Sequence, residues 1–167
     1  FVHPKHLIPA EITELTSITN ADVADAPSAV EAVAALADFV GGCPVIAHNA
    51  TFDRSFIESV KGGVNVSDIW IDSLALSRIA LPRLISHKLS FMADLFGCDS
   101  VSHRANADVD ALCGVWRVLL VALTDLPSGL MARLADMHAD VPWSYRPIFS
   151  FLAGQNPGSI FSLSAAR

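Results

Sequence analysis

The sequence has few cysteines, a single tyrosine and no long uninterrupted apolar run. Cys43, Cys98 and Cys113 are widely spaced and form no C-x-x-C pair, which argues against a disulfide framework and a zinc knuckle. We therefore expect reduced, buried thiols in a cytoplasmic protein. Charge, Gly or Pro interrupts each apolar stretch before it reaches the roughly 20 residues of a membrane-spanning helix. The first residues lack a signal-peptide pattern, so export is not indicated.

Positive charge is also scarce, because 11 Lys and Arg residues face 17 Asp and Glu residues, a formal net charge of -6. Coating of nucleic acid is driven by Lys and Arg, so this balance argues against a protein that simply coats it. It leaves open an enzyme that approaches phosphate through bound metal, because a cation site must itself be acidic.

The 167 residues fit one globular domain with a short appendage. Short, apolar strands are predicted at residues 44–48 and 69–71. Predicted helices cover residues 9–19, 28–40, 51–61, 72–81, 88–96 and 105–123. This alternation indicates an α/β layered fold. From residue 125 onward prolines and aromatic residues are interspersed, and we expect this extension to pack on the domain or on a neighbouring one.

A first polar cluster follows the predicted strand at residues 44–48. Asp53 lies about one turn into the next helix, so it can project from the carboxyl edge of the sheet, where α/β proteins usually carry sites. Asn49 occupies the strand-to-helix turn, where its amide either orients a ligand or caps the helix. An acidic residue in a first helical turn is also an ordinary stabilising choice, so this cluster alone leaves both interpretations open.

A second cluster, His103 and Asp108, lies at the start of the long predicted helix at residues 105–123. Their spacing lets both converge on one space in front of the helix, whereas Asp110 points about 200° away from Asp108 on an ideal helix. Carboxylates suit hard divalent cations, and a histidine can take a proton near neutral pH. Alternatively, His103 is a loop residue and Asp108 a partner of the helix dipole.

Read in order, these clusters and several shorter motifs closely resemble the 3′→5′ exonucleases of the DEDD superfamily, histidine subgroup. That family includes the proofreading epsilon subunit of bacterial DNA polymerase III and exonuclease domains fused to polymerases or helicases. The motifs are residues 8–12, 15–19, 48–53 (His-Asn-Ala-Thr-Phe-Asp), 71–74, 86–89 and 103–108 (His-Arg-Ala-Asn-Ala-Asp). The resemblance implies a ribonuclease H-like three-layer α/β fold, with a mixed sheet flanked by helices, over residues 1–124. Residues 125–167 would be a C-terminal extension.

The resemblance also implies roles for individual residues. Asp108 would be a direct ligand of Mg²⁺ or Mn²⁺, Asp53 would hold the second metal, and His103 would be the general base. Residues expected to bind the substrate are Thr16, Ile18, His48, Asn49 and Phe52. Asp72 is interpreted as a helix cap rather than a ligand.

The implied activity is release of nucleoside monophosphates from single-stranded or frayed DNA 3′ ends, in proofreading or repair. RNA remains open as a substrate, and the expected partners are a polymerase or a fused helicase.

The D-x-E pair that this family carries on its first strand is absent from the sequence. Glu11 and Glu14 lie on a predicted helix and do not replace it. We therefore expect an N-terminally incomplete exonuclease domain that is inactive by itself. The alternative is a catalytically inactive domain that serves as a nucleic-acid or protein interaction module. Because uncovered strand edges and apolar sheet faces promote association, we expect the chain alone to self-associate or to borrow strands.

Overall fold

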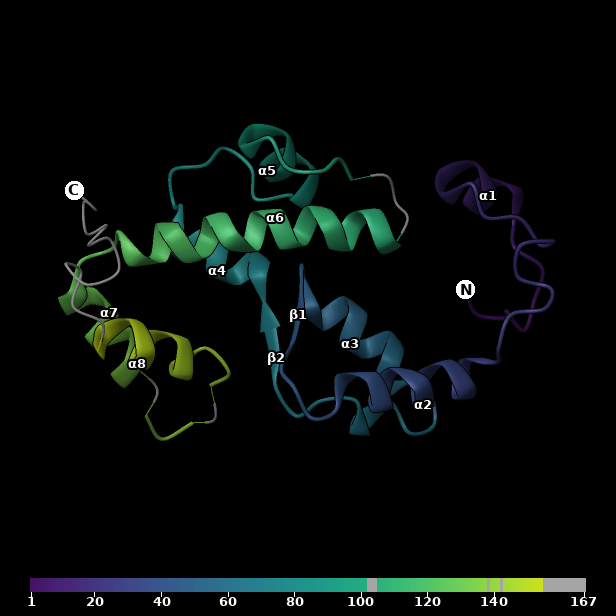
Figure 1. The fold of residues 1–167 in the computed structure, drawn as a ribbon, viewed down its shortest axis with the longest axis horizontal. Coiled ribbons are helices and arrows are strands. Elements are labelled where there is room, and N and C mark those ends of the chain that lie inside the picture. Colours follow the sequence, from purple (N-terminus) through teal and green to yellow (C-terminus); the bar gives the residue numbers. More distant parts are fainter. Residues whose placement is uncertain (102–104, 138, 142, 155–167) are drawn as a thin grey trace, which may run out of the picture.

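A computed structural model describes residues 1–101, 105–137, 139–141 and 143–154 (Figure 1). Helices alternate with two short strands along the first two thirds of the chain, as the sequence predicted. The elements before the second strand are α1 (Ala10–Thr16), α2 (Ala29–Val40), β1 (Val45–Ala47), α3 (Ala50–Glu58) and the short 3₁₀ helix η1 (Gly63–Asn65). The remaining elements are β2 (Trp70–Asp72), α4 (Ser73–Ala80), α5 (Leu89–Phe96), α6 (Ala105–Thr124), α7 (Ser128–Asp136) and α8 (Arg146–Gly154).

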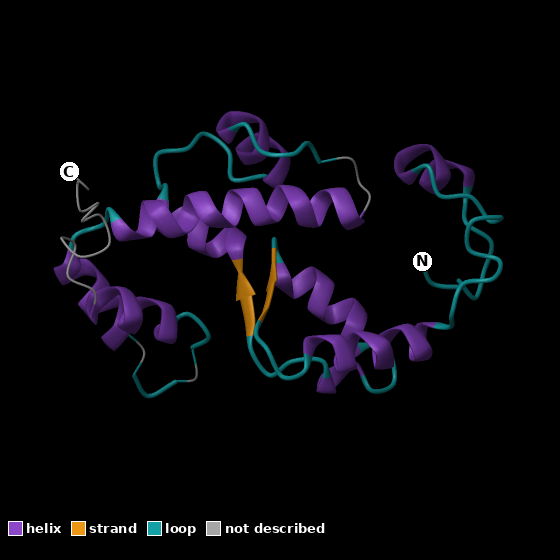
Figure 2. Cartoon of the chain, viewed as in Figure 1, coloured by secondary structure: helices purple, strands orange, loops and turns teal. Residues whose placement is uncertain are grey.

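The two strands form a parallel pair in the middle of the molecule (Figure 2). Ile46 lies opposite Ile71, and α3 with η1 provides the crossover that a parallel pair requires. Side chains alternate between the two faces of a strand. Ile71 accordingly belongs to one core cluster and Trp70 to another. Helices therefore cover both faces of the strand pair, which gives three layers.

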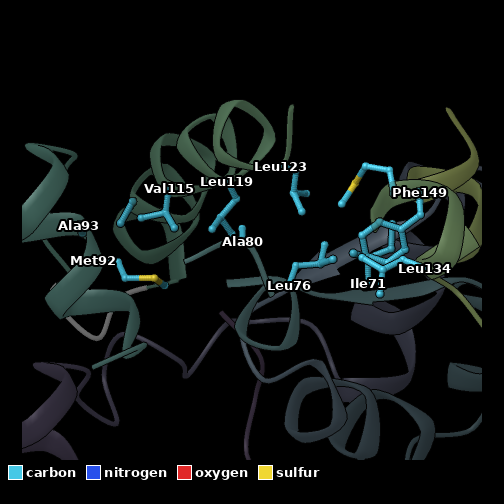
Figure 3. Packing of buried hydrophobic residues seen from close by; sticks show 12 residues of the cluster. Ile71, Leu76, Ala80, Met92, Ala93, Val115, Leu119, Leu123, Leu134 and Phe149 are labelled. Carbon is cyan, nitrogen blue, oxygen red and sulfur yellow. The ribbon is translucent and has the colours of Figure 1, made fainter. Parts of the chain in front are cut away.

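The larger core cluster lies between β2 and the helices α4 to α8 (Figure 3). Leu76 from α4, Met92 from α5 and Leu119 from α6 have no exposed surface. In Figure 3 Met92 lies beside Val115 of α6, and Leu119 lies beside Ala80 of α4. Helix α6 thus packs on α4 and α5, the helices that it contacts most. The buried residues of α6, from Ala111 to Leu123, thus hold this long helix against the core.

The smaller cluster packs α2 and α3 against the other face and contains Val33, Ala50, Val66 and Trp70. The start of α2 is fixed by a capping box, in which Glu31 N–H donates to Ser28 Oγ at 3.3 Å and Ser28 N–H donates to the Glu31 carboxylate at 2.8 Å. The Ser28 hydroxyl, which also donates to that carboxylate, lowers the pKa of Glu31.

The C-terminal extension packs into the larger core, so the packing prediction is confirmed for its described residues. It contains two helices, α7 and α8, that the sequence analysis did not predict. Pro127 caps the start of α7 and Pro147 lies in the first turn of α8, positions where proline is tolerated. Phe149 from α8 has no exposed surface and contributes to the same core as Leu123.

All three cysteines are free, and the expectation that they are buried was wrong for two of them. Cys43 is exposed in the loop before β1, and Cys113 is exposed on an outward face of α6. Only Cys98 is partly buried, beside the larger core. No helix among the described residues is long and apolar enough to span a membrane.

Candidate functional site

A cavity of about 890 Å³ lies beside β1, between α2 and α3 on one side and the start of α6 on the other. Its walls are mainly apolar, but three polar side chains predicted from sequence line it: Asp53, Asp108 and His48. The structure therefore brings the two predicted metal ligands to one space, although they come from different helices. The apolar lining residues include Leu36, Phe39, Val45, Ile57, Trp70, Leu89 and Leu112.

Asp53 lies in the first turn of α3, directly after the carboxyl end of β1. Its carboxyl group faces the cavity, and the loss of solvent around it raises its pKa. The nearby negative charge of Asp72 also raises the pKa of Asp53. A cation bound nearby would lower the free-energy cost of ionising the Asp53 carboxyl group, because an opposite charge favours the ionised form.

Asp108 occupies the first turn of α6 and is partly buried in the opposite wall of the cavity. Asp110, two residues further on, is exposed and is not part of the cavity wall. The helical geometry thus separates the two carboxylates as the sequence analysis predicted. His103, the predicted general base, lies outside the described residues, and its role stays a prediction.

Asn49 forms the turn between β1 and α3 in a left-handed conformation, with φ of 71°. Asparagine tolerates this region better than most residues. Its side chain makes no capping hydrogen bond to α3, so the interpretation of Asn49 as a side-chain cap was wrong. The side chain is exposed, and the backbone N–H donates to Asp72 Oδ1 at 2.8 Å. Contact of the Asn49 amide with a substrate stays a prediction.

His48 lies at the end of β1 with both ring nitrogens near protein groups. Nδ1 is 2.9 Å from Ser73 Oγ, and Nε2 is 2.8 Å from the carbonyl oxygen of His87. Burial lowers the pKa of His48, which favours the neutral ring at neutral pH. Since a neutral ring donates through one nitrogen, Nε2–H is assigned to the His87 carbonyl. These bonds hold the turn in place, and contact of His48 with substrate stays a prediction.

Phe52 is 60% exposed on α3, beside Asp53. Its ring packs against that of Phe56, with the centroids 4.9 Å apart. Phe56 is also exposed and was not singled out from sequence, although its spacing of one helical turn from Phe52 is a visible signal. A substrate contact by Phe52 remains a prediction.

Thr16 and Ile18 do not line the cavity. Thr16 is the last residue of α1, and Ile18 follows it. Helix α1 contains no buried residue and lies to one side of the sheet in Figure 1. Thr16 Oγ1 donates to the carbonyl oxygen of Ile12 at 2.7 Å and accepts the N–H of Ile18 at 3.2 Å, so it shapes the end of this helix. The structure therefore does not bring Thr16 and Ile18 together with Asp53 and Asp108, and their contact with a terminal nucleotide stays a prediction.

Asp72 caps α4, as predicted, because its Oδ1 accepts the N–H of Leu74 at 2.9 Å. Sequence reasoning missed its second partner, Asn49, and also missed Tyr145. Asp72 N–H donates to the hydroxyl of Tyr145 at 3.1 Å. The one signal for Tyr145 was that it is the only tyrosine in the chain.

Within the described residues, no group of three or more His, Cys, Asp or Glu side chains is arranged to hold a metal ion. Asp53 and Asp108 supply two carboxylates to the cavity. Mg²⁺ commonly binds through one or two carboxylates, with water and substrate phosphates completing its coordination. The donor set present is therefore of the right chemistry for such an ion.

The comparison that decides the family covers more than half of the chain, since residues 1–116 match the Exonuclease (RNase_T) family. The chain belongs to this exonuclease family. The DEDD-type resemblance inferred from the motifs is thereby confirmed, and with it the ribonuclease H-like α/β fold.

Relatives of this exonuclease-family chain include DNA polymerase III PolC-type proteins. That of Caldanaerobacter subterraneus subsp. tengcongensis is 36% identical over 148 residues, which are 82% of this chain and 11% of the polymerase. That of Clostridium perfringens is 36% identical over 110 residues, 65% of this chain and 8% of the polymerase. The chain thus spans about a tenth of the length of the curated relatives it matches.

A similar solved structure is Exonuclease X in complex with 5′ overhanging duplex DNA. It superposes with a TM-score of 0.55 at 22% sequence identity, over 71% of this chain and 69% of that one. At this identity the likeness concerns the fold, and it agrees with the three-layer arrangement of the exonuclease-family chain.

Proposed function

We propose that this domain is part of a metal-dependent 3′→5′ exonuclease that releases nucleoside monophosphates from DNA ends during proofreading or repair. The observation that supports this most directly is the convergence of Asp53 and Asp108 on one cavity at the carboxyl end of β1. Family membership supports the nuclease activity, and the PolC-type relatives support a role beside a DNA polymerase.

Each residue has a defined role in this proposal. Asp108 and Asp53 would hold Mg²⁺ or Mn²⁺, and such ions lower the pKa of bound water and stabilise charge on phosphate oxygens. His103 would take the proton of the attacking water, a role suited to a group that titrates near neutral pH. The exposed amide of Asn49 would orient the terminal nucleotide beside Asp53.

Two carboxylates are fewer than a two-metal site requires, and the chain contains no D-x-E pair. We therefore propose that activity requires further carboxylates from another segment of the natural protein, and that residues 1–167 alone are inactive. The free cysteines agree with a reducing, cytoplasmic environment, which is where we propose the protein acts. A polymerase or a fused helicase would be its partner.

The test uses the natural protein in its full reading frame and single-stranded DNA oligonucleotides labelled at either end. With Mg²⁺ or Mn²⁺, a 3′ label should leave at once as a mononucleotide, while a 5′ label should give a ladder of shortened strands. Removal of the metal with EDTA should stop both. Early release of a 5′-labelled mononucleotide, or degradation that persists in EDTA, would refute the proposal.

The same assay separates the alternatives. An RNA oligonucleotide of the same sequence measures the choice between DNA and RNA, which depends on contacts to the 2′-hydroxyl. Binding of DNA without any degradation by the full-length protein would instead identify an interaction module.

A further inference from the structure

Asp72, the last residue of β2, connects three segments of the chain. Its Oδ1 accepts the N–H of Asn49, in the turn after β1, and the N–H of Leu74, in the first turn of α4. Its own N–H donates to the hydroxyl of Tyr145, which immediately precedes α8. One residue therefore joins the Asn49 turn, the start of α4 and the C-terminal extension.

Tyr145 is held by the core of the C-terminal extension. Its ring packs edge-on against Trp143 with centroids 5.6 Å apart, and Trp143 packs against the fully buried Phe149 with centroids 5.4 Å apart. Burial raises the pKa of Tyr145, so its hydroxyl keeps its proton at neutral pH. The oxygen that accepts from Asp72 therefore belongs to a neutral hydroxyl on a fixed ring.

Support for Asn49 matters because its backbone is left-handed, a conformation that asparagine tolerates better than most residues but that still favours glycine. No side-chain capping bond from Asn49 holds the start of α3. The bond from its N–H to Asp72 is the constraint on the Asn49 backbone that comes from β2, beside the His48 bonds and the bond from Phe52 N–H to the Asn49 carbonyl. The same turn presents Asn49 and, one helical turn later, Asp53.

We propose that Tyr145 is a positioning residue that acts through Asp72 to hold the Asn49 turn in the conformation needed for binding of the substrate end. This inference rests on the proposed function. It extends the site beyond residues 1–116, which match the exonuclease family, to a residue of the C-terminal extension.

Hydrogen–deuterium exchange of the full-length protein tests the structural part of the proposal. In Tyr145→Phe the ring stays and the hydroxyl is lost, and with it the bond from Asp72 N–H at 3.1 Å and the bond to the Asp72 carbonyl oxygen at 3.5 Å. Asp72 should then hold the Asn49 N–H less firmly, and the Asn49 amide should exchange about five-fold faster. The matched control is Trp143→Phe, which changes the same aromatic cluster without touching the bond to Asp72. Equal effects of the two variants, or no change in Tyr145→Phe, would overturn the proposal.

Two variants of Asp72 test whether Tyr145 acts on the Asn49 turn through this residue. Asp72→Asn retains an oxygen that can accept from Asn49 and should exchange like the wild type, whereas Asp72→Ala should exchange faster than Tyr145→Phe. If the alanine variant leaves the Asn49 amide protected, the turn is held by other contacts and Tyr145 has no positioning role.

Steady-state kinetics then test whether the Asn49 turn affects binding of the DNA substrate. Tyr145→Phe should raise KM for a DNA oligonucleotide about three-fold to five-fold, with kcat changed less than about two-fold, because a hydroxyl outside the cavity alters binding geometry rather than chemistry. A loss confined to kcat would contradict this assignment. Absence of activity in the wild-type protein would refute the proposed function, while the exchange measurements would still decide the role of Tyr145.

Discussion

At the residue scale, Asp53 is the side chain whose acid–base chemistry the fold changes in a way that bears on function. Partial burial raises its pKa, so the folded protein disfavours the charged carboxylate relative to the unfolded chain. Its contribution to stability is therefore fully present below the ordinary pKa of aspartate and is lost as the pH rises through the raised value. Cation binding has the opposite dependence, because it needs the ionised form.

Asp53→Asn should accordingly stabilise the metal-free chain at neutral pH. Because the side chain is exposed on one side, the gain should be at most about 0.5 kcal/mol, and it should disappear in acid. Thermal unfolding at equal protein concentrations measures it, with Asp110→Asn, an exposed carboxylate outside the cavity, as the matched control. A marked loss of stability in Asp53→Asn at neutral pH would contradict the assigned cause of the shift.

Some residues of the site could be predicted from the sequence, and others could not. Asp53 and Asp108 were identified because their spacing from a strand end and a helix start can be read along the chain. The partners of His48 could not be predicted in this way, since Ser73 and the carbonyl of His87 lie far away in sequence. For Asn49, only the structure shows that the side chain makes no capping hydrogen bond, and its contact with a ligand stays a prediction.

At the scale of elements, Phe149 is the residue of α8 that has no exposed surface, and it packs in the larger core. Phe149→Ala should lower the free energy of unfolding by about 3–5 kcal/mol, since it removes a large buried ring and leaves a cavity. Phe151, on the same helix, is 65% exposed, and Phe151→Ala should change stability by less than about 0.5 kcal/mol. Similar losses for both variants in urea denaturation would mean that α8 is not docked as described.

Helix α6 approaches the end of α5 closely at Gly114. A Cβ atom there would lie 2.8 Å from Cys98 Sγ and 2.9 Å from Cys98 Cβ, so Cys98 would have to shift. Gly114→Ala should therefore cost about 1–3 kcal/mol of stability despite the better helix propensity of alanine. At Gly129 in α7 a Cβ meets nothing within 4 Å, and Gly129→Ala should gain about 0.5–1 kcal/mol.

The same scale explains why α7 and α8 escaped prediction. Pro127 and Pro147 were interpreted as signs of an irregular extension, because proline usually interrupts helices. Both prolines lie at helix starts, where the missing N–H carries no cost. The earlier helices were predicted because glycine at their ends, such as Gly41 and Gly97 in left-handed conformations, marks termination directly.

At the scale of the whole molecule, the cavity beside β1 leaves apolar surface uncovered. Among the described residues β1 pairs only with β2, so its other edge has no strand partner there. The backbone N–H and C=O groups of successive residues in a parallel strand point alternately to the two neighbouring positions in the sheet. Val45 directs its N–H to Ile69 beside β2, so the backbone groups of Ile46 point toward the open edge. Phe39, which lines the cavity, is 88% exposed, and large side chains elsewhere on the surface, such as Ile85 at 91% exposed, add to this apolar area.

Residues 1–167 alone should therefore self-associate, because open strand edges and large apolar patches drive association. Size-exclusion chromatography with light scattering should detect dimers or larger species whose fraction rises with concentration. Elution as a stable monomer at all concentrations would show that the edge and the cavity are protected in another way.

The central claim is that the cavity carboxylates, and not the neighbouring acidic residue, perform the chemistry. The direct measurement is the rate of mononucleotide release from a 3′-labelled oligonucleotide by the full-length protein carrying Asp108→Asn, Asp53→Asn or Asp110→Asn. We expect the first two variants to lose at least about 100-fold in rate, since each removes a proposed metal ligand. Asp110→Asn should stay within about two-fold of the wild type, because its carboxylate is no part of the cavity wall. Full activity in Asp108→Asn would contradict the account.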